Sequence, residues 1–450
     1  MDKPPHPLSI PEFRAYWLSR LAGTIALSAQ GIIIGWQVYG LAREQLGYSI
    51  ERAASMLGLI GLVQFVPLFL LTPVVGLVAD SVDRRWIVRG TTTLLTLNAL
   101  LLGALTWAGD LSLVSLFVAA GVVGFARAFA GPAYSALAPN LVPREVLPTA
   151  IAISTLAWQS GTIIGPSVGG LLFALHPDIA YSTVAGLFVV ALALIFRIGP
   201  VPQPPVQRDR HPLRRIADGF SYVRENRLVL ATITLDLFVV LLAGATALLP
   251  IYARDILHVG ATGLGVLAAA MGVGAAVASV WFSVRPMKTN VGVKMLWSVA
   301  IFALAILVFG TATWLTDRAG VTRVAFGVAG IETLPIDFLL SVVALAVAGA
   351  ADMVSVYVRT SLVQLHTPDA MRGRVSAVSQ LTISASNELG EAESGLLASF
   401  LGPVGAVVFG AAGALFITLG WSRLFPELRR ATTFDFPVTE IPPHNGVAQP

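Results

Sequence analysis

SGTIIGPSVGG, residues 160–170, lies inside an uninterrupted apolar segment and decides the class of fold. Gly and Pro destabilise helices in water, so their density here is unusual for a soluble helix. Gly161, Gly165 and Gly169 are four residues apart and share one helical face, which lets a neighbouring helix approach backbone to backbone. Pro166 removes one backbone donor and frees the carbonyl one turn earlier, so the helix bends. We expect a membrane helix whose smooth, kinked face slides or hinges.

The composition of the whole chain indicates lipid as its solvent. Of 450 residues, 56% are hydrophobic and only 12% are charged, and the mean hydropathy is +0.78. Soluble domains have about 25% charged residues, so this chain cannot cover itself with a polar surface. It has no cysteine, which excludes disulfides and thiolate chemistry, and its six histidines lack metal-ligand spacing. We expect no metal and no cofactor.

Apolar segments long enough to cross a bilayer recur along the chain, since a spanning helix needs about 20 such residues. The first is too long for a signal peptide and lacks a clean cleavage site, so we expect it to be retained. The pattern predicts an all-α integral membrane protein with twelve spans: 15–40, 56–79, 86–107, 111–135, 149–173, 179–198, 228–251, 263–284, 293–315, 336–358, 375–399 and 403–422.

An internal repeat divides these spans into two six-helix halves. Residues 137–156 align without gaps to 362–381 at an offset of 225, which also places Gly390 at Gly165 and Gly395 at Gly170. Two related halves are typical of an alternating-access transporter. We therefore predict the following organisation: a first half at 1–198, a cytoplasmic linker at 199–227 with an amphipathic helix, a second half at 228–422, and a disordered cytoplasmic tail at 423–450.

The basic residues predict the orientation. An even number of spans places both termini on one side, and most of the 29 Lys and Arg residues fall on that side. Those assigned to the opposite side are Arg43, Arg52, Arg254, Arg318 and Arg323. By the positive-inside rule, both termini are cytoplasmic. The sequence pI of about 9.6 thus reflects topology, and we expect no nucleic-acid partner.

A charged loop between the second and third spans has two interpretations. It contains Gly76, Asp80, Asp83, Arg84 and Arg85. Acids beside paired arginines at a helix end can form a network that locks one arrangement of helices, which would be a cytoplasmic gate. The alternative is that the arginines only set the topology.

This loop resembles a signature of the major facilitator superfamily, with Ser81 in place of a usual Arg and Asp83 in place of a usual Gly. The segment from Arg127 to Gly131 is similar to that family's Arg-x-x-x-Gly pattern of proton-coupled export. Residues 161–170 match its helix 5 motif of proton-driven antiporters, which includes Pro166.

The resemblance covers essentially the whole chain. VPREVLPTA and NELGEAESGL are similar to the transmembrane secretion effector group, which contains enterobactin-exporter-like proteins. This resemblance implies export of a small-molecule substrate and a location in the bacterial inner membrane.

Ionisable residues within spans are costly and indicate function or pairing. In the superfamily fold, helices 1, 4, 7 and 10 line a cavity, and here they contribute Arg20, Arg127, Asp236 and Asp352. Our hypothesis is that these charges pair across the cavity when the cytoplasmic side closes, and that proton uptake by an aspartate weakens the pairing. The alternative is that Arg20 reaches the headgroups and the others form static bonds.

Helix 11 adds Glu388 and Glu391, three residues apart on one face, whereas Glu393 points elsewhere. Two acids on one buried face favour a shared proton. The alternative is a hydrated position near the outer mouth of the cavity.

The sequence therefore predicts a proton-coupled secondary active exporter of a siderophore-like molecule or amphiphilic drug. The proton gradient is its energy source, because no Walker-type P-loop is present. The alternatives are an importer or lysophospholipid flippase on the same fold, or a transport-inactive membrane scaffold. A membrane enzyme is disfavoured because no nucleophile, base or metal cluster is found. We expect a monomer whose partners are its substrate and the lipid bilayer.

Overall fold

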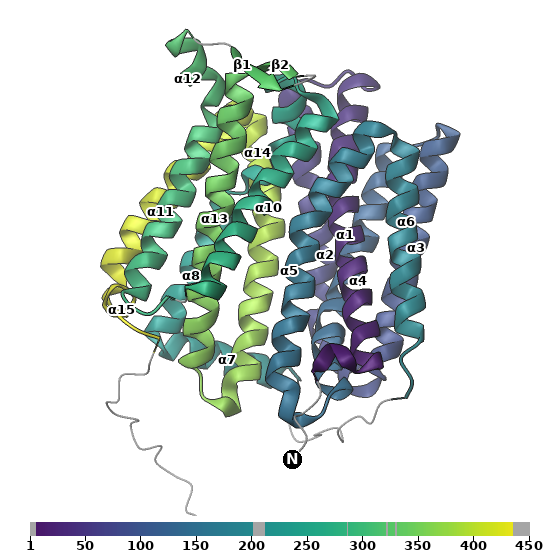
Figure 1. Ribbon diagram of the computed structural model, residues 1–450, viewed down its shortest axis with the longest axis vertical. Coiled ribbons are helices and arrows are strands. Elements are labelled where there is room, and N and C mark those ends of the chain that lie inside the picture. Colours follow the sequence, from purple (N-terminus) through teal and green to yellow (C-terminus); the bar gives the residue numbers. More distant parts are fainter. Residues whose placement is uncertain (1–5, 201–211, 286, 321–322, 329–330, 435–450) are drawn as a thin grey trace, which may run out of the picture.

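The computed structural model describes residues 6–200, 212–285, 287–320, 323–328 and 331–434 and forms a bundle of long helices (Figure 1). The first half contains η1 (Pro7–Ser9), α1 (Pro11–Glu44), α2 (Ile50–Ser81), α3 (Arg84–Ala108), α4 (Leu113–Leu137), η2 (Ala138–Leu141), η3 (Arg144–Val146), α5 (Leu147–Leu175) and α6 (Pro177–Phe196).

The rest of the chain continues with α7 (Pro212–Glu225), α8 (Arg227–Leu242), η4 (Ala245–Leu248), α9 (Leu249–Ile251), the π-helical turn η5 (Tyr252–Ile256), α10 (Gly260–Val284), α11 (Val291–Gly310) and α12 (Ala312–Ala319). It ends with β1 (Arg323–Val328), β2 (Ile331–Pro335), α13 (Ile336–Leu365), α14 (Asp369–Leu424) and α15 (Pro426–Arg430). The two strands form an antiparallel hairpin in which Arg323 lies opposite Pro335.

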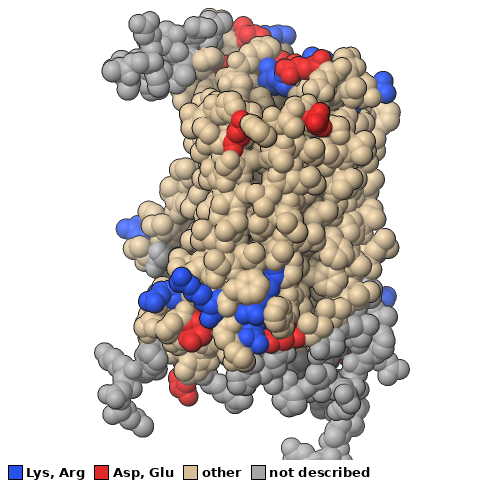
Figure 2. Space-filling model, turned by 90° about the vertical axis from the view of Figure 1, so that its right-hand side faces the viewer, with Lys and Arg blue, Asp and Glu red and all other residues tan. Residues whose placement is uncertain are grey.

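The bundle has two ends, which we name from Figure 1. The proximal end, at the bottom, contains the start of α1 and α7; the distal end, at the top, contains α12 and the β1–β2 hairpin. In the face shown in Figure 2, Lys, Arg, Asp and Glu gather near these two ends, and the surface between them is almost entirely uncharged. Large apolar side chains such as Leu70, Trp107 and Phe416 are exposed on the outside of the bundle. This surface fits a lipid bilayer.

Ten helical segments among the described residues are long and apolar enough to cross a membrane. One of them, within α14, contains more than one crossing, because 56 helical residues would extend about 80 Å, far beyond the hydrocarbon thickness. Gly402 interrupts this helix with φ 72° and ψ 164°, and Pro403 follows. The all-α membrane fold is confirmed, whereas the number of twelve spans stays a prediction.

One sequence prediction needs refinement and another needs correction. The predicted span 228–251 lies within the candidate membrane-spanning segment Arg227–Ile256, but this segment is not one continuous α-helix. α8 ends at Leu242, and Gly244 packs so closely on α14 that a Cβ there would lie 2.6 Å from the carbonyl oxygen of Gly390. The tail predicted as disordered from 423 is ordered as far as 434. Its residue Leu428 is fully buried, and Ala431 accepts a backbone hydrogen bond from Gly292 at 3.0 Å.

An ion pair anchors the start of this tail, since Arg227 contacts Glu427 at 2.7 Å. Residues 435–450 lie outside the described part of the chain, as does 201–211 of the predicted linker. The predicted amphipathic helix of the linker is present as α7.

The glycine-rich face of α5 packs as its sequence predicts. Gly161, Gly165 and Gly169 lie against α1, where a Cβ at any of them would approach the nearest α1 atom to 2.5–2.6 Å. At Gly170, α5 leaves α1 and meets α10: a Cβ there would lie 2.5 Å from the Cα of Gly265. One helix thus holds its own half together and also contacts the other half.

The segment of α14 that the repeat matches to the glycine-rich face of α5 makes corresponding contacts. Gly390 lies against α8, where a Cβ would be 2.7 Å from the carbonyl oxygen of Val240, and Gly395 lies against Gly58 of α2. The first glycine of each matched pair therefore packs on the first long helix of its own half, and the second packs on the second long helix of the other half. This agreement supports the repeat at an offset of 225 residues.

Candidate functional site

An ion pair near the middle of the bundle joins the two halves. Arg127 of α4 donates from one guanidinium NH group to the carboxylate of Glu388 in α14. Glu388 is only 3% exposed. Arg127 also donates to the side-chain oxygen of Gln64 in α2 at 3.3 Å. The Arg127 side chain is 34% exposed, whereas that of Glu388 is buried. A charge-assisted contact with one buried partner links the positions of α4 and α14.

Two glycines bring the three helices of this site together. Gly124 lies one turn before Arg127, and a Cβ there would be 2.8 Å from the Cα of Gln64. Gly61 lies one turn before Gln64, and a Cβ there would be 2.6 Å from the carbonyl oxygen of Glu388. Close backbone approach at these glycines places the Arg127, Gln64 and Glu388 side chains within reach of one another.

Glu391 follows Glu388 by one turn and belongs to the same site. Its Cβ would lie 2.8 Å from a Cβ placed at Gly61, and it interacts electrostatically with both Glu388 and Arg127. Glu393 has a different neighbour, since its carboxylate accepts a hydrogen bond from Ser394 at 3.5 Å. Two carboxylates thus share one guanidinium, which leaves a surplus negative charge unless one acid carries a proton.

The four charges predicted to pair across a cavity do not pair with one another in this conformation. Arg20 donates to the hydroxyls of Tyr16 and Ser154, both at 2.8 Å and both within the first half. Asp236 forms an ion pair with Arg359 inside the second half.

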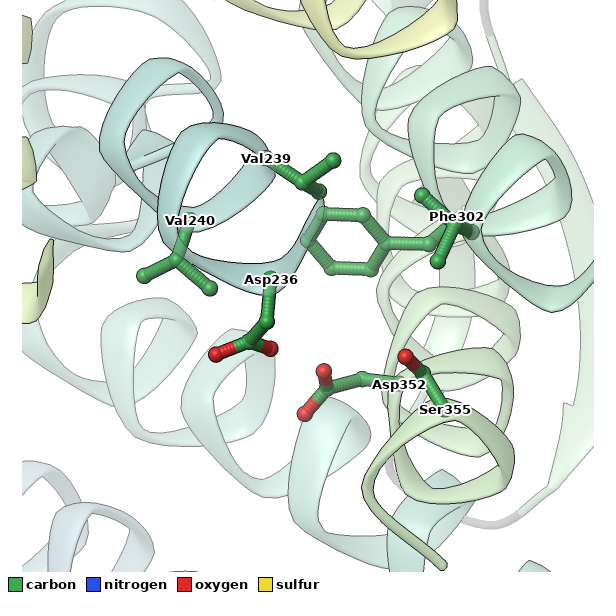
Figure 3. Close-up of a pocket in the computed structure, with 7 residues that line it drawn as sticks. Asp236, Val239, Val240, Phe302, Asp352 and Ser355 are labelled. Carbon is green, nitrogen blue, oxygen red and sulfur yellow. The ribbon is translucent and has the colours of Figure 1, made fainter. Parts of the chain in front are cut away.

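Asp352 lies beside Asp236 at a small cavity (Figure 3). Whether any of these four residues takes part in coupling stays a prediction.

Sequence reasoning missed Arg359 because the predicted span ended one residue before it. The structure extends α13 to Leu365, so Arg359 lies within the helix and is 6% exposed. Its position seven residues after Asp352 places both on one helical face, and that spacing was an available signal.

In the charged loop between α2 and α3, Arg84 and Arg85 contact residues of the first half. Asp83 caps α3 by accepting from the backbone N–H of Arg85 at 2.9 Å, and it also forms an ion pair with the Arg85 side chain at 2.5 Å. Arg84 donates to the carbonyl of Ala136 in α4 at 3.1 Å. The surroundings of Gly76 and the side chain of Asp80 lie outside the described part, so the gate stays a prediction.

A second set of contacts between the halves lies at the distal end, where the sequence predicted only loop charges. Asp255 of η5 accepts from the Tyr39 hydroxyl and pairs with Arg43 at 3.2 Å. Its neighbour Arg254 pairs with Glu44. Together with the packing of Gly58 on Gly395 and of Gly170 on Gly265, these contacts hold the distal ends of the halves together.

A helical membrane bundle of two related halves, with charged contacts between them, has the architecture of a membrane transporter of the major facilitator superfamily. The chain belongs to the transmembrane secretion effector family, which it matches over residues 3–436. It is 28% identical to the enterobactin exporters of Citrobacter koseri and of Escherichia coli O1:K1, each over 430 residues that cover 93% of both chains.

A solved structure shows a similar fold. It is the bacterial homologue of the human lysosomal transporter Spinster in an inward-facing and unoccupied conformation, with a TM-score of 0.67 at 15% identity. The match covers 93% of this chain and 98% of that one.

Proposed function

We propose that this transporter is a proton-coupled secondary active exporter of a small molecule across the bacterial inner membrane by alternating access. The ion pair between Arg127 and Glu388 carries the proposal, because it joins the two halves at mid-depth and includes a group that can take up a proton. The relatives named as enterobactin exporters favour a siderophore-like substrate, and an amphiphilic drug is the second substrate class. The proton gradient supplies the energy.

Coupling follows from the charge balance of the site. With a proton on Glu391, the Arg127–Glu388 pair is neutral and stabilises the distal-closed arrangement. A proton on Glu388 removes the counter-ion of Arg127, so the link between α4 and α14 weakens and the equilibrium between conformations shifts. Protonation on one side of the membrane and release on the other would then drive a conformational cycle.

The direction of transport depends on orientation. We infer that the proximal end is cytoplasmic, because the predicted excess of Lys and Arg lies at that end. The described contacts between the halves at the distal end favour a conformation that is closed toward the outside. The substrate would enter from the cytoplasm, and the proton would enter from outside.

Transport by purified protein in liposomes tests the proposal, with enterobactin and ethidium as separate probes. An imposed pH gradient should drive uptake of one probe into inside-out liposomes. Glu388→Gln should slow this uptake about tenfold or more, which corresponds to roughly 1.4 kcal/mol. Exchange of probe across the membrane at equal pH should persist in this variant, because exchange requires no net proton movement.

The matched control is Glu393→Gln, which removes an acid on the same helix outside the ion pair and should leave the pH-driven rate unchanged. Unchanged pH-driven uptake in both Glu388→Gln and Glu391→Gln would show that the site does not couple transport to protons.

A further inference from the structure

A small cavity lies inside the second half, away from the ion pair that joins the halves. It has a volume of about 20 Å³, enough for one water-sized occupant. Its lining comes from α8, α11 and α13, namely Asp236, Val239, Val240, Val299, Phe302, Asp352 and Ser355. Figure 3 shows the carboxyl groups of Asp236 and Asp352 extending toward one another from facing helices, with Ser355 one turn beyond Asp352.

The cavity carries a surplus negative charge. Asp236 is neutralised by Arg359, which is not among the lining residues. Asp352 has no ion pair or hydrogen bond with another residue in the part of the chain that the structure describes. A carboxylate in an otherwise apolar cavity at membrane depth is costly unless a positive charge compensates it.

The Ser355 hydroxyl is an independent indication of an occupant. Ser355 is 4% exposed and lines the cavity, and within the described residues its hydroxyl has no hydrogen-bond partner. Serines in helices can bond the carbonyl four residues earlier, as Ser279 does at 2.9 Å. A buried hydroxyl without such a bond is available to a ligand in the cavity.

We propose that this cavity binds one Na⁺ ion through the carboxylates of Asp236 and Asp352 and the hydroxyl of Ser355. Hard cations prefer oxygen ligands of these types. A monovalent ion balances the single surplus charge, whereas a divalent ion would leave a buried positive charge. The space admits one small ion, and a proton alone would require neither this space nor the hydroxyl. The bound ion would tie α8 to α13, and this role is separate from the proposed proton coupling.

Thermal unfolding of the purified full-length protein in detergent tests the site without any transport measurement. The melting temperature is measured in NaCl, KCl and choline chloride at equal ionic strength. Na⁺ should raise it in a saturable manner, while K⁺ and choline should not. Ser355→Ala should raise the half-saturating Na⁺ concentration roughly 10-fold or more, as loss of a supporting group does at metal sites. Asp352→Asn should abolish the response.

Ser298→Ala is the matched control, because Ser298 is also buried but donates its hydroxyl to Met295 within α11 at 2.8 Å. It should respond to Na⁺ as the unmodified protein does. Equal melting temperatures in the three salts, or a full Na⁺ response in Asp352→Asn, would overturn the proposal. If Asp352→Asn does not fold, the Ser355→Ala titration and direct binding of ²²Na⁺ to the unmodified protein decide the matter.

Discussion

Arg359 and Asp236 show how single buried charges are accommodated in this chain. Both side chains are less than a tenth exposed, and each is the other's counter-ion. Neither charge could stay buried alone at low cost, since removing one partner of a buried ion pair leaves an uncompensated charge. The pair should therefore stabilise the second half itself.

This arrangement leads to a prediction for single and double substitutions. Asp236→Asn should lower the free energy of unfolding by about 3–5 kcal/mol, because Arg359 then lacks a counter-ion. The double variant Asp236→Asn with Arg359→Gln should recover much of that loss, since no unpaired charge remains. Denaturant unfolding of the detergent-solubilised protein measures both. Additive losses in the double variant would contradict a stabilising pair.

At the level of residues, sequence reasoning identified the charged side chains better than their partners. Glu388 was predicted to share a face with Glu391, and Arg127 was predicted to act in coupling, but nothing in the sequence relates positions 261 residues apart. Their contact depends on Gly61 and Gly124, which set how closely three helices approach. Such distances arise from packing and are not visible in hydropathy.

Among the elements, the glycine contacts between the halves control how closely the distal ends approach. A Cβ at Gly58 would lie 2.9 Å from the carbonyl oxygen of Ala392 and 2.9 Å from the Cα of Gly395. Both neighbours are backbone atoms, which cannot rotate away as a side chain can. Closure of the distal end thus requires glycine at this position.

We expect Gly58→Ala to disfavour the distal-closed conformation by about 1–3 kcal/mol, the usual cost of overpacking. The chain has no cysteine, so a single Leu264→Cys reporter needs no background substitutions. Leu264 is 1% exposed and precedes Gly265 at the contact with α5. A membrane-impermeant maleimide should label this cysteine faster when Gly58→Ala is present.

Gly31→Ala is the control for this change, because Gly31 is also within a long helix but a Cβ there meets nothing within 4 Å. It should leave the labelling rate unchanged. Equal labelling with Gly58→Ala would mean that the close contact does not determine closure.

Sequence patterns predicted the elements well where one segment of regular helical periodicity forms one helix. The amphipathic helix of the linker and the glycine face of α5 are examples. The errors occur where tertiary contacts override the pattern. The α-helix after Asn226 is interrupted near Gly244, which packs on α14. The start of the polar tail is ordered because Leu428 is buried and Glu427 pairs with Arg227.

For the whole molecule, the distal ion pairs act on the balance between conformations. α1 contributes Tyr39, Arg43 and Glu44, and η5 contributes Arg254 and Asp255, so every one of these contacts joins the two halves. Arg254 also lies over the ring of Trp36 at 5.6 Å. Opening toward the distal side must break all of them. They therefore stabilise one conformation of the transporter without being needed for its fold.

Asp255→Asn should accordingly favour distal opening, because Arg43 loses its counter-ion and Tyr39 loses a charged acceptor. These side chains are partly exposed, so we expect only about 1–2 kcal/mol, which is about a 5- to 30-fold change in the equilibrium between conformations. Labelling of the Leu264→Cys reporter should speed up accordingly. The difference from the unmodified protein should shrink at high salt, which screens the pairs that Asp255→Asn removes.

The matched control is Asp178→Asn, since Asp178 is an acid whose contact with the imidazole of His176, at 3.2 Å, stays within one half. It changes the net charge equally but breaks no contact between the halves, so the labelling rate should not change. If both substitutions speed labelling equally, general charge rather than the specific pairs sets the equilibrium. If Asp255→Asn has no effect, the contacts that remain there, which include the Arg254–Glu44 pair and the glycine contacts, hold the distal end closed without Asp255.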